Sequence, residues 1–583
     1  MIAGAFRMSL SDRQWIVLQH FYETKMTYDL RTEPWIPWRR RQSGIVWGPI
    51  SMLTDGMRGD DAVIATAAPR ADFDGALQEF LVGMLTSAFS VADDDAWRNL
   101  WDNPPSADQV QHALNALPAA FDLDSEIGPR FLQDFDPSAL AEQAVLPIDR
   151  LAIDSPGEQG VKFNKTLFVK AARFEVLGRP AAAMALITMQ TYAPAGGQGN
   201  RTSMRGGGPL TTLADPRQNT SAAHADEQPL WEKLWMNVET AEDWSARASG
   251  SGARTPSSEF AWMAPTKSSD AKKPPVTPKH AHSLQAYFGM PRRIRLEFGE
   301  AGTCGITART DERCVIGFRM RNYGVEYTGW KHPLSPYRND KGEWLPLHPQ
   351  PGGIGWKDWP DLALQTSGGD REAATVISHA NARANELGLR EIRLHAFGFD
   401  MDNMKARAWI SALQPLIIFN DDSPKAREWL GMLARSLVDA TRTTASSLSL
   451  AIKNALYDRL EDAGNDDVVP RQRLWYSTET RFFETLRRVA AQGLDLESVS
   501  EARRAFHEPL RNEVMQLFDE FCAIESAPIT ALRRHVTARH GLAVTMNGYG
   551  KFGKQLFELL NLPPREVSAA AKKKATSKKG AKV

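Results

Sequence analysis

Six glycines and two arginines are concentrated in one short segment. It runs from Ala193 to Leu210 and reads A-P-A-G-G-Q-G-N-R-T-S-M-R-G-G-G-P-L. Glycine has no Cβ atom, so this backbone can approach another surface closely and can adopt positive φ angles. Arg201 and Arg205 could contact phosphate oxygens or base edges. These residue types allow two interpretations, a flexible surface loop or a loop that binds nucleic acid.

Other residues that could bind a metal or a phosphate do not form recognisable motifs. The sequence contains no G-x-x-x-x-G-K-[S/T], no H-E-x-x-H and no G-x-S-x-G. Cys304 and Cys314 lack the second pair of ligands that a structural zinc site needs. His280 and His282 have no acidic or cysteine partner nearby in the sequence. We therefore expect no metal and no cofactor.

Two acidic clusters leave a metal-dependent nuclease open as a second hypothesis. Asp93 to Asp95 and Asp421 to Asp422 could supply carboxylate ligands. The first cluster also has the composition of a helix N-cap, and the second that of a turn between helices. We expect these structural roles for both.

Length and composition limit the class of protein. A chain of 583 residues is too long for one core, so two or three domains are expected. The 70 basic and 70 acidic side chains cancel, so any affinity for nucleic acid must come from local patches or from partners. No apolar run approaches the roughly 18 residues of a membrane helix, and the N-terminus lacks a secretory signal. The three cysteines, Cys304, Cys314 and Cys522, are an odd number, and their spacings do not match a disulfide framework. This cysteine usage indicates a reducing cytoplasm.

Hydrophobic periodicity changes along the chain. Residues 285–420 are expected to form mainly strands and turns, and R-R-I-R-L-E-F after Pro291 alternates with period two, as expected of a strand. Two further alternating runs, the first with Ile392, Leu394 and Ala396 on one face, lie on either side of Asp400 to Met404 and predict a β-hairpin with its tip there. From Ser423, a predicted N-cap followed by Pro424, the period is 3.6 and predicts several amphipathic helices. We expect an amphipathic helix also just before the glycine-rich segment.

Three segments have compositions that predict little packed structure. Residues 1–27 precede the first strongly patterned segment and are interpreted as an extension. Residues 215–282 form a polar insertion rich in Ser, Thr, Pro and Lys, interrupted by the aromatic group Phe260 to Trp262. Residues 566–583 are interpreted as a basic disordered tail, with six lysines among the last 13 residues.

Five motifs in this order resemble the CasA family, the large subunits of type I-E CRISPR Cascade complexes. They are E-P-W-I-P, the helix and glycine loop ending in R-G-G-G-P-L, P-R-R-I-R-L-E-F, Y-G-V-E-Y-T-G-W-K-H-P-L-S-P-Y, and F-G-F-D-M-D-N-M-K-A-R-A-W. The resemblance covers about residues 28–412, and the predicted helices follow where the family has its helical bundle. It implies an α+β chain with a large mixed α/β N-terminal domain at 28–412 and a C-terminal four-helix bundle at 413–565.

The resemblance also implies a function and a set of partners. CasA proteins are non-catalytic subunits that recognise the protospacer-adjacent motif (PAM) of double-stranded DNA through its minor groove. They start unwinding of the duplex and recruit the helicase–nuclease. The expected partners are the other Cascade subunits with their crRNA, double-stranded target DNA and the CRISPR helicase–nuclease, without a membrane.

Three family elements that read the PAM can be aligned with this sequence. The basic finger aligns with Arg321, and Arg319 is the alternative if the alignment shifts by two residues. The wedge at a hairpin tip aligns with Asn403, with Asp402 beside it. The glycine loop aligns with Ala195, Gly196, Gly197, Gln198 and Gly199.

Further contacts are implied less directly. Lys341 aligns with a lysine that holds DNA without sequence preference, and Arg201 and Arg319 are candidates for the same role. The segment Asp154 to Gly157 aligns with the region that meets the crRNA handle. A third interpretation is an assembly platform whose loops have lost the PAM contacts.

Overall fold

A computed structural model describes most of the chain. It covers residues 27–565 except 164–165, 167–168, 170–171, 218–226, 248–250, 271–272, 365–368, 390, 403–404, 419–422, 465–467 and 524–528. The predicted extension up to residue 26 and the predicted tail 566–583 therefore lie outside the described residues.

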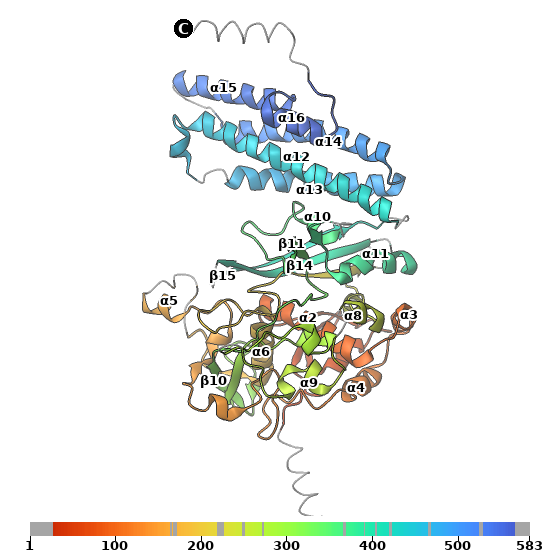
Figure 1. Cartoon of the computed structure of the whole chain (residues 1–583), viewed down its shortest axis with the longest axis vertical. Helices are drawn as coiled ribbons and strands as arrows, with labels where there is room; N and C mark the ends of the chain where they lie inside the picture. The colour runs from red at the N-terminus through yellow and green to blue at the C-terminus, as the bar shows by residue number, and fades with distance from the viewer. Residues whose placement is uncertain are drawn as a thin grey trace, which may run out of the picture. The chain divides into compact units, whose positions relative to one another are not determined.

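Contacts divide the chain into two compact units. Unit 1 comprises Met1–Pro351, Ala374–Ala380 and His395–Ser411. Unit 2 comprises Gly352–Ala373, Asn381–Leu394 and Ala412–Val583. Unit 2 thus includes two stretches that the sequence analysis assigned to the N-terminal domain. The mixed helix and strand content of unit 1 and the helices of unit 2 confirm the predicted α+β class (Figure 1).

Unit 1 combines small antiparallel sheets with helices. One sheet has the order β2-β1-β3 and another the order β4-β10-β5, with β7 also paired to β10. β11 and β12 form a hairpin, and β8 pairs with β9. The strands are β1 (Ile36–Arg40), β2 (Gly44–Gly48), β3 (Val63–Thr66), β4 (Leu146–Pro147), β5 (Leu177–Gly178), β6 (Thr211–Arg217), β7 (Arg293–Phe298), β8 (Gly302–Thr303), β9 (Thr310–Asp311), β10 (Cys314–Arg321), β11 (Tyr337–Asp340) and β12 (Glu343–Pro346). The helices are α2 (Ala71–Phe89), α3 (Asp94–Asp102), α4 (Ala107–Asn115), α5 (Glu158–Lys162), α6 (Arg179–Tyr192), α7 (Leu230–Trp235), α8 (Ala241–Arg247) and α9 (Pro256–Glu259).

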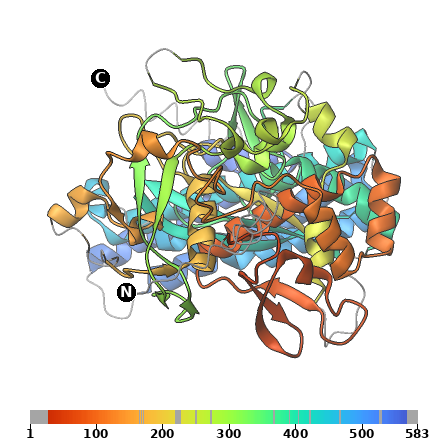
Figure 2. The same ribbon diagram turned by 90° about the horizontal axis from the view of Figure 1, so that it is seen from below.

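β7 and β10 are the longest antiparallel pair of unit 1 for which the register is defined, and they appear as adjacent green arrows in Figure 2. Arg319 pairs with Arg295, and Arg321 pairs with Arg293. Directly opposite residues point to the same side of a sheet, so these four arginines share one face. The alternating run R-R-I-R-L-E-F was correctly predicted as a strand.

The predicted hairpin is also confirmed. β14 (Glu391–Asp402) and β15 (Lys405–Leu416) are neighbours in a sheet of order β15-β14-β6, and only 403–404 separate them. Both strands cross the boundary between the units, and so does α11 (Thr375–Leu387). Ile392, Leu394 and Ala396 are fully buried, as their alternation predicted.

The prediction that 215–282 contains little packed structure is wrong for the described part of that segment. Trp231 and Trp235 are fully buried and stack with ring centroids 4.7 Å apart. Trp262 is buried as well, and its indole N–H donates to the Ala120 carbonyl oxygen at 2.5 Å. Ser, Thr, Pro and Lys dominate the composition, but a few large aromatic side chains supply the buried surface that orders a segment.

The helix before the glycine-rich segment is not amphipathic as predicted. In α6 nearly every side chain from Ala181 to Tyr192 is buried, because the helix runs through the core of unit 1 beside α2. Small alanine side chains let neighbouring helices approach closely. Because alanine occurs on both buried and exposed helix faces, the sequence does not show which sides of this helix are covered.

Unit 2 is built from long helices around one apolar core. They are α12 (Pro424–Leu456), α13 (Val468–Gln492), α14 (Leu496–Phe521), α15 (Ile529–Met546) and α16 (Gly550–Leu559). α12 packs against all four others (Figure 1). The Ser423 hydroxyl accepts from the Ala426 amide, and Pro424 follows it, so the predicted helix start is confirmed. Before the bundle lie the short elements α10 (Trp359–Ala363) and β13 (Arg371–Glu372).

Tryptophans explain why Gly352–Ala373 belongs to unit 2. Trp356 stacks on Phe482 of α13 with ring centroids 4.4 Å apart, and Trp359 is fully buried beside Phe482 and Phe483. The spacing of these tryptophans carries no signal of which core they enter, so the sequence could not assign them.

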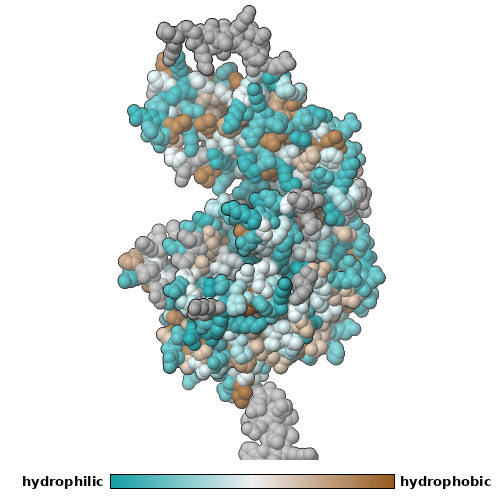
Figure 3. All heavy atoms as spheres, in the orientation of Figure 1, coloured by the Kyte–Doolittle hydropathy of each residue, from teal (hydrophilic) through white to brown (hydrophobic). Residues whose placement is uncertain are grey.

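The surface shown in Figure 3 is mostly hydrophilic, with apolar residues in small groups on the helical unit. Within the described residues, no single helix is long and apolar enough to cross a membrane. α2 and α3 reach that apolar length only as a pair bent by 111°. All three cysteines are buried and free.

Candidate nucleic-acid interface

The glycine loop is an ordered turn whose tip is exposed. The Asn200 amide donates to the Gly197 carbonyl oxygen at 3.2 Å and closes the turn. Gly197 and Gly199 have φ angles of 85° and 76°, which side chains other than glycine rarely adopt. Gly196, Gly197 and Gln198 face solvent, whereas Ala195 and Gly199 are half-buried. At its tip the loop therefore presents the backbone of two glycines and one side chain, that of Gln198.

The end of β10 holds this turn from one side. The Tyr323 amide donates to the Gly199 carbonyl oxygen at 2.7 Å. The Asn322 side chain donates to the Gln198 carbonyl oxygen at 3.0 Å. A Cβ atom on Gly199 would lie 2.9 Å from Asn322 Cβ, so this close approach requires glycine. The glycine loop and the predicted basic finger, 124 positions apart in sequence for the Gln198–Asn322 contact, thus lie side by side.

The two candidate basic fingers differ in their surroundings. Arg319 pairs with Glu297 at 2.5 Å and also donates to the Ala141 and Gln143 carbonyl oxygens. Arg321 is exposed, and its one hydrogen bond within the described residues goes to the Ala139 carbonyl oxygen at 3.1 Å. The Arg319 guanidinium is therefore occupied by contacts within the protein, whereas Arg321 keeps N–H donors that could bind a ligand.

The hairpin β14–β15 contacts the other end of the glycine-rich segment. A Cβ atom on Gly208 would lie 2.7 Å from Met401, on β14. Tyr192, at the end of α6, packs edge-to-face on Phe399 and Trp409 of the hairpin. Asp402 is exposed at the end of β14, and Asn403 lies outside the described residues.

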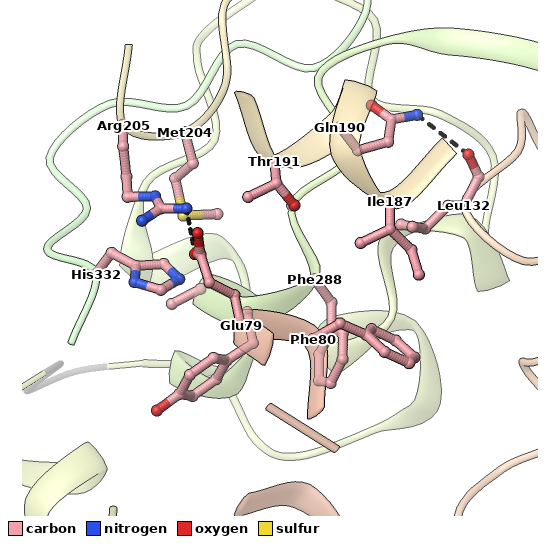
Figure 4. A pocket seen from close by; sticks show the side chains of 13 residues that line it. Glu79, Phe80, Leu132, Ile187, Gln190, Thr191, Met204, Arg205, Phe288 and His332 are labelled. Carbon is pink, nitrogen blue, oxygen red and sulfur yellow. Dashed lines mark hydrogen bonds and ion pairs between the residues drawn. The ribbon is translucent and has the colours of Figure 1, made fainter. Parts of the chain in front are cut away.

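A buried ionic network ties both ends of the loop to α2. Arg205, 3% exposed, pairs with Glu79 at 2.5 Å (Figure 4). It also donates to Thr211 and Ser335. The Tyr192 hydroxyl donates to the same carboxylate, and burial followed by the Glu79 charge raises the pKa of Tyr192 well above its usual value. Arg205 was a candidate for phosphate or base contacts, and that suggestion is wrong because the side chain is enclosed with a counter-ion.

Figure 4 also shows His332 beside Arg205 and Glu79 in this pocket. The His332 ring is buried, and its Nδ1 accepts from the Leu334 amide at 3.2 Å. Burial and the charges of Arg205 and Arg247 lower the pKa of His332 well below 6.5. The ring is therefore neutral at neutral pH, and it adds no positive charge to the network.

The remaining candidates lie in different settings. Arg201 pairs with Glu326 at 3.0 Å and donates to Ser269. Lys341 is exposed at the β11–β12 turn with a φ of 54°. Asp154, in the segment aligned with the crRNA side, pairs with Arg70 and Arg173.

The acidic clusters have the structural features expected of them where they are described. Asp93 caps α3 by accepting from the Ala96 amide at 2.9 Å. Asp421 and Asp422 lie outside the described residues. Among the residues that the structure describes, no group of three or more His, Cys, Asp or Glu side chains is arranged to hold a metal ion.

Sequence reasoning missed the side chains that hold the loop: Glu79, Asn322 and Arg292. Glu79 and Asn322 carry no sequence signal, since each acts on a segment more than a hundred residues away. Arg292 had a signal. It is in phase with the buried Ile294 and Leu296, so period-two alternation assigns an arginine to the core side.

Comparisons with known proteins identify the family and the fold of the chain. The sequence profile described as CRISPR-associated protein Cse1 matches residues 29–517. CasA (Cse1) of Thermus thermophilus is 19% identical, with a TM-score of 0.63 over 91% of this chain and 99% of that one. Cse1 of Thermobifida fusca is 18% identical, with a TM-score of 0.61 over 92% and 98%. A chain described as a CRISPR RNA-guided surveillance complex is 16% identical, with a TM-score of 0.62 over 88% and 99%. No curated protein matches this chain.

Proposed function

This chain belongs to the Cse1 family of CRISPR-associated proteins, and we propose that it is the non-catalytic large subunit of a cytoplasmic, crRNA-guided type I-E Cascade complex. In this role it recognises the PAM through the minor groove, starts unwinding and recruits the helicase–nuclease. Its partners are the other Cascade subunits with crRNA, the target duplex and that nuclease.

One observation carries the proposal: an exposed, Cβ-poor turn lies against the strand end that bears Arg321. The minor groove presents mostly acceptors, and it distinguishes base pairs poorly. Backbone donors and one guanidinium suit such a surface, because they need no side chain that reads individual bases. We expect several related PAM sequences to be accepted, while the guide RNA supplies the remaining specificity by base pairing.

The hairpin supplies the second part of the proposed mechanism. Its tip, at Asp402 and Asn403, is the proposed wedge beside the first target base pair. Parting that pair costs a few kcal/mol, which the wedge and the new contacts must offset. Tyr192, Phe399 and Trp409 join the hairpin to the segment that enters the glycine loop, so both elements are set on one support.

The test is a complex reconstituted with crRNA and duplexes that differ only in the PAM. We expect Arg321→Ala to slow PAM-dependent opening on the order of 10-fold, as loss of about 1–3 kcal/mol of groove contact would. Asn403→Ala should also slow opening. Binding to a target opened in advance should change little in both variants.

Arg98→Ala serves as the control, since Arg98 is a partly exposed arginine on α3 with an i,i+4 partner in Asp102. It should leave both measurements unchanged. Equal loss by Arg321→Ala on closed and pre-opened targets would contradict the proposed role. A wild-type complex that opens duplexes regardless of the PAM would favour a platform that has lost these contacts.

The nuclease hypothesis has its own test. The purified protein is incubated with labelled duplex and Mg²⁺ or Mn²⁺, and we expect no cleavage. Asp93→Asn removes the charge and keeps a side chain that caps helices well. Metal-dependent cleavage that this variant or Asp421→Asn abolishes would establish the nuclease instead.

A further inference from the structure

Arg292 is a buried arginine without a carboxylate partner. Arg292 is 6% exposed, and burial alone lowers the pKa of its guanidinium to about 10. Across the described part of the chain, no Asp or Glu is paired with it, and its Nε has no hydrogen-bond partner. Burying an unpaired charge is costly, so such a residue calls for a compensating role.

Its two terminal nitrogens contact opposite ends of the glycine loop. Nη2 donates to the carbonyl oxygen of Pro194, directly before the loop, and Nη1 donates to Oδ1 of Asn200, directly after it. Asn200 in turn donates to the Gly196 carbonyl oxygen at 2.7 Å. One planar guanidinium therefore spans the base of the turn, which a single-point donor such as lysine cannot do.

The main chain of Arg292 is fixed by the helix that leads into the loop. The Gln190 side chain of α6 accepts from the Arg292 amide at 2.9 Å and donates to the Arg292 carbonyl oxygen at 3.0 Å. The side-chain amide of Gln190 also donates to the Leu132 carbonyl oxygen, as drawn in Figure 4. α6 thus sets the position of Arg292, and Arg292 sets the segment that follows α6.

The neighbouring arginines of the strand have other tasks. Arg293 pairs with Asp134, and Arg295 donates to the Asp134 carbonyl oxygen. Both lie on the opposite side of the alternating strand from Arg292. The contact with the loop therefore belongs to Arg292 and not to a general basic surface.

We propose that Arg292 is a positioning residue that holds the glycine loop in the conformation needed to read the PAM. This inference rests on the proposed function. The buried positive charge behind the turn acts in the same direction, since no carboxylate among the described residues neutralises it and it lies beside the backbone proposed to meet groove acceptors. Arg292 itself does not touch DNA.

The experiment compares Arg292→Lys and Arg292→Met with Arg295→Lys, a similarly buried arginine of β7 whose hydrogen bond goes elsewhere. Two quantities are measured. The first is amide hydrogen exchange, in the free subunit, of Asn200 and Tyr323, whose N–H groups donate to the loop carbonyl oxygens of Gly197 and Gly199. The second is opening of correct and altered PAM duplexes by the reconstituted complex. We expect both Arg292 variants to speed exchange at Asn200 and Tyr323. We expect them to reduce the ratio of the opening rate on the correct PAM to that on the altered PAM, on the order of 10-fold, with Arg292→Lys less affected than Arg292→Met.

Binding to a pre-opened target should stay at the wild-type level in both variants, and Arg295→Lys should change neither quantity. Wild-type PAM discrimination in a folded Arg292→Lys complex would overturn the inference, and so would equal loss on pre-opened target. If Arg292→Met does not fold, Arg292→Lys decides alone. Loss of discrimination by Arg321→Ala but by neither Arg292 variant would sink this inference and leave the proposed function standing.

Discussion

At the level of single residues, backbone conformation limits what the loop tolerates. Gly199→Ala would place a side chain at a φ of 76° and 2.9 Å from Asn322 Cβ. We expect a cost of about 1–2 kcal/mol in stability from the positive φ alone, and loss of PAM-dependent opening. Guanidinium unfolding and the opening assay measure the two effects.

Gly541→Ala is the matched control for that change. Gly541 lies in α15, and a Cβ atom there would meet nothing within 4 Å. Alanine in a helix interior should raise stability by about 0.5–1 kcal/mol and leave opening unchanged. A Gly199→Ala protein that opens PAM duplexes normally would contradict the assignment of the loop.

Protonation of His332 gives a prediction about pH. Because burial and two arginine charges lower the pKa of the folded-state ring well below 6.5, the unfolded chain binds this proton first as the pH falls. The stability that depends on the neutral His332 ring is fully present above about pH 6.5. It is lost as the pH falls below this value, at up to about 1.4 kcal/mol per pH unit. His332→Asn keeps an acceptor for Leu334, and its unfolding free energy should fall less steeply than that of wild type between pH 6.5 and 5. Parallel curves for both proteins would refute this account.

At the level of elements, the start of α12 depends on one cap. Ser423 accepts from the Ala426 amide at 3.2 Å. Ser423→Ala should lower the stability of the helical unit by about 1 kcal/mol, because an amide of the first turn loses its partner. Ser423→Asp should restore it, since aspartate caps equally well. Chemical unfolding followed by far-UV circular dichroism measures the change, and an unaltered midpoint for Ser423→Ala would exclude the cap.

The buried ion pair between α2 and the glycine-rich segment should contribute more to stability than the Ser423 cap does. Glu79→Gln removes the counter-ion of Arg205, which stays buried. Removing one partner of a buried ion pair typically costs about 3–5 kcal/mol. We expect a loss of this size in unfolding free energy, together with slower PAM-dependent opening. A change below about 1 kcal/mol, typical of an exposed pair, would show that the network is not enclosed in solution.

For the whole molecule, charge balance sets how strongly the chain can bind DNA alone. With 70 basic and 70 acidic side chains, it has no net attraction for phosphate. We expect the isolated subunit to bind duplex DNA far more weakly than the assembled complex does, and with a shallower dependence on salt. Titration of both with the same duplex at several salt concentrations checks this. Equal affinity and slope would place the phosphate contacts on this chain.

Local signals in the sequence determined the elements. Alternation around Asp400 to Met404 defined the hairpin, and Ser423-Pro424 defined the start of α12, because both depend on neighbours within a few residues. The ordered motifs also identified the family. These features need only local backbone preference and the type of residue at each position.

Only the tertiary structure decided what each arginine does. Arg205, Arg292, Arg319 and Arg321 have the same side chain, yet one pairs with Glu79, one spans the loop, one pairs with Glu297 and one stays exposed. The partners of Arg205 and Arg292 lie 126 and 98 positions away. Burial and charge pairing at such separations arise when distant segments pack together, and local sequence patterns do not encode them.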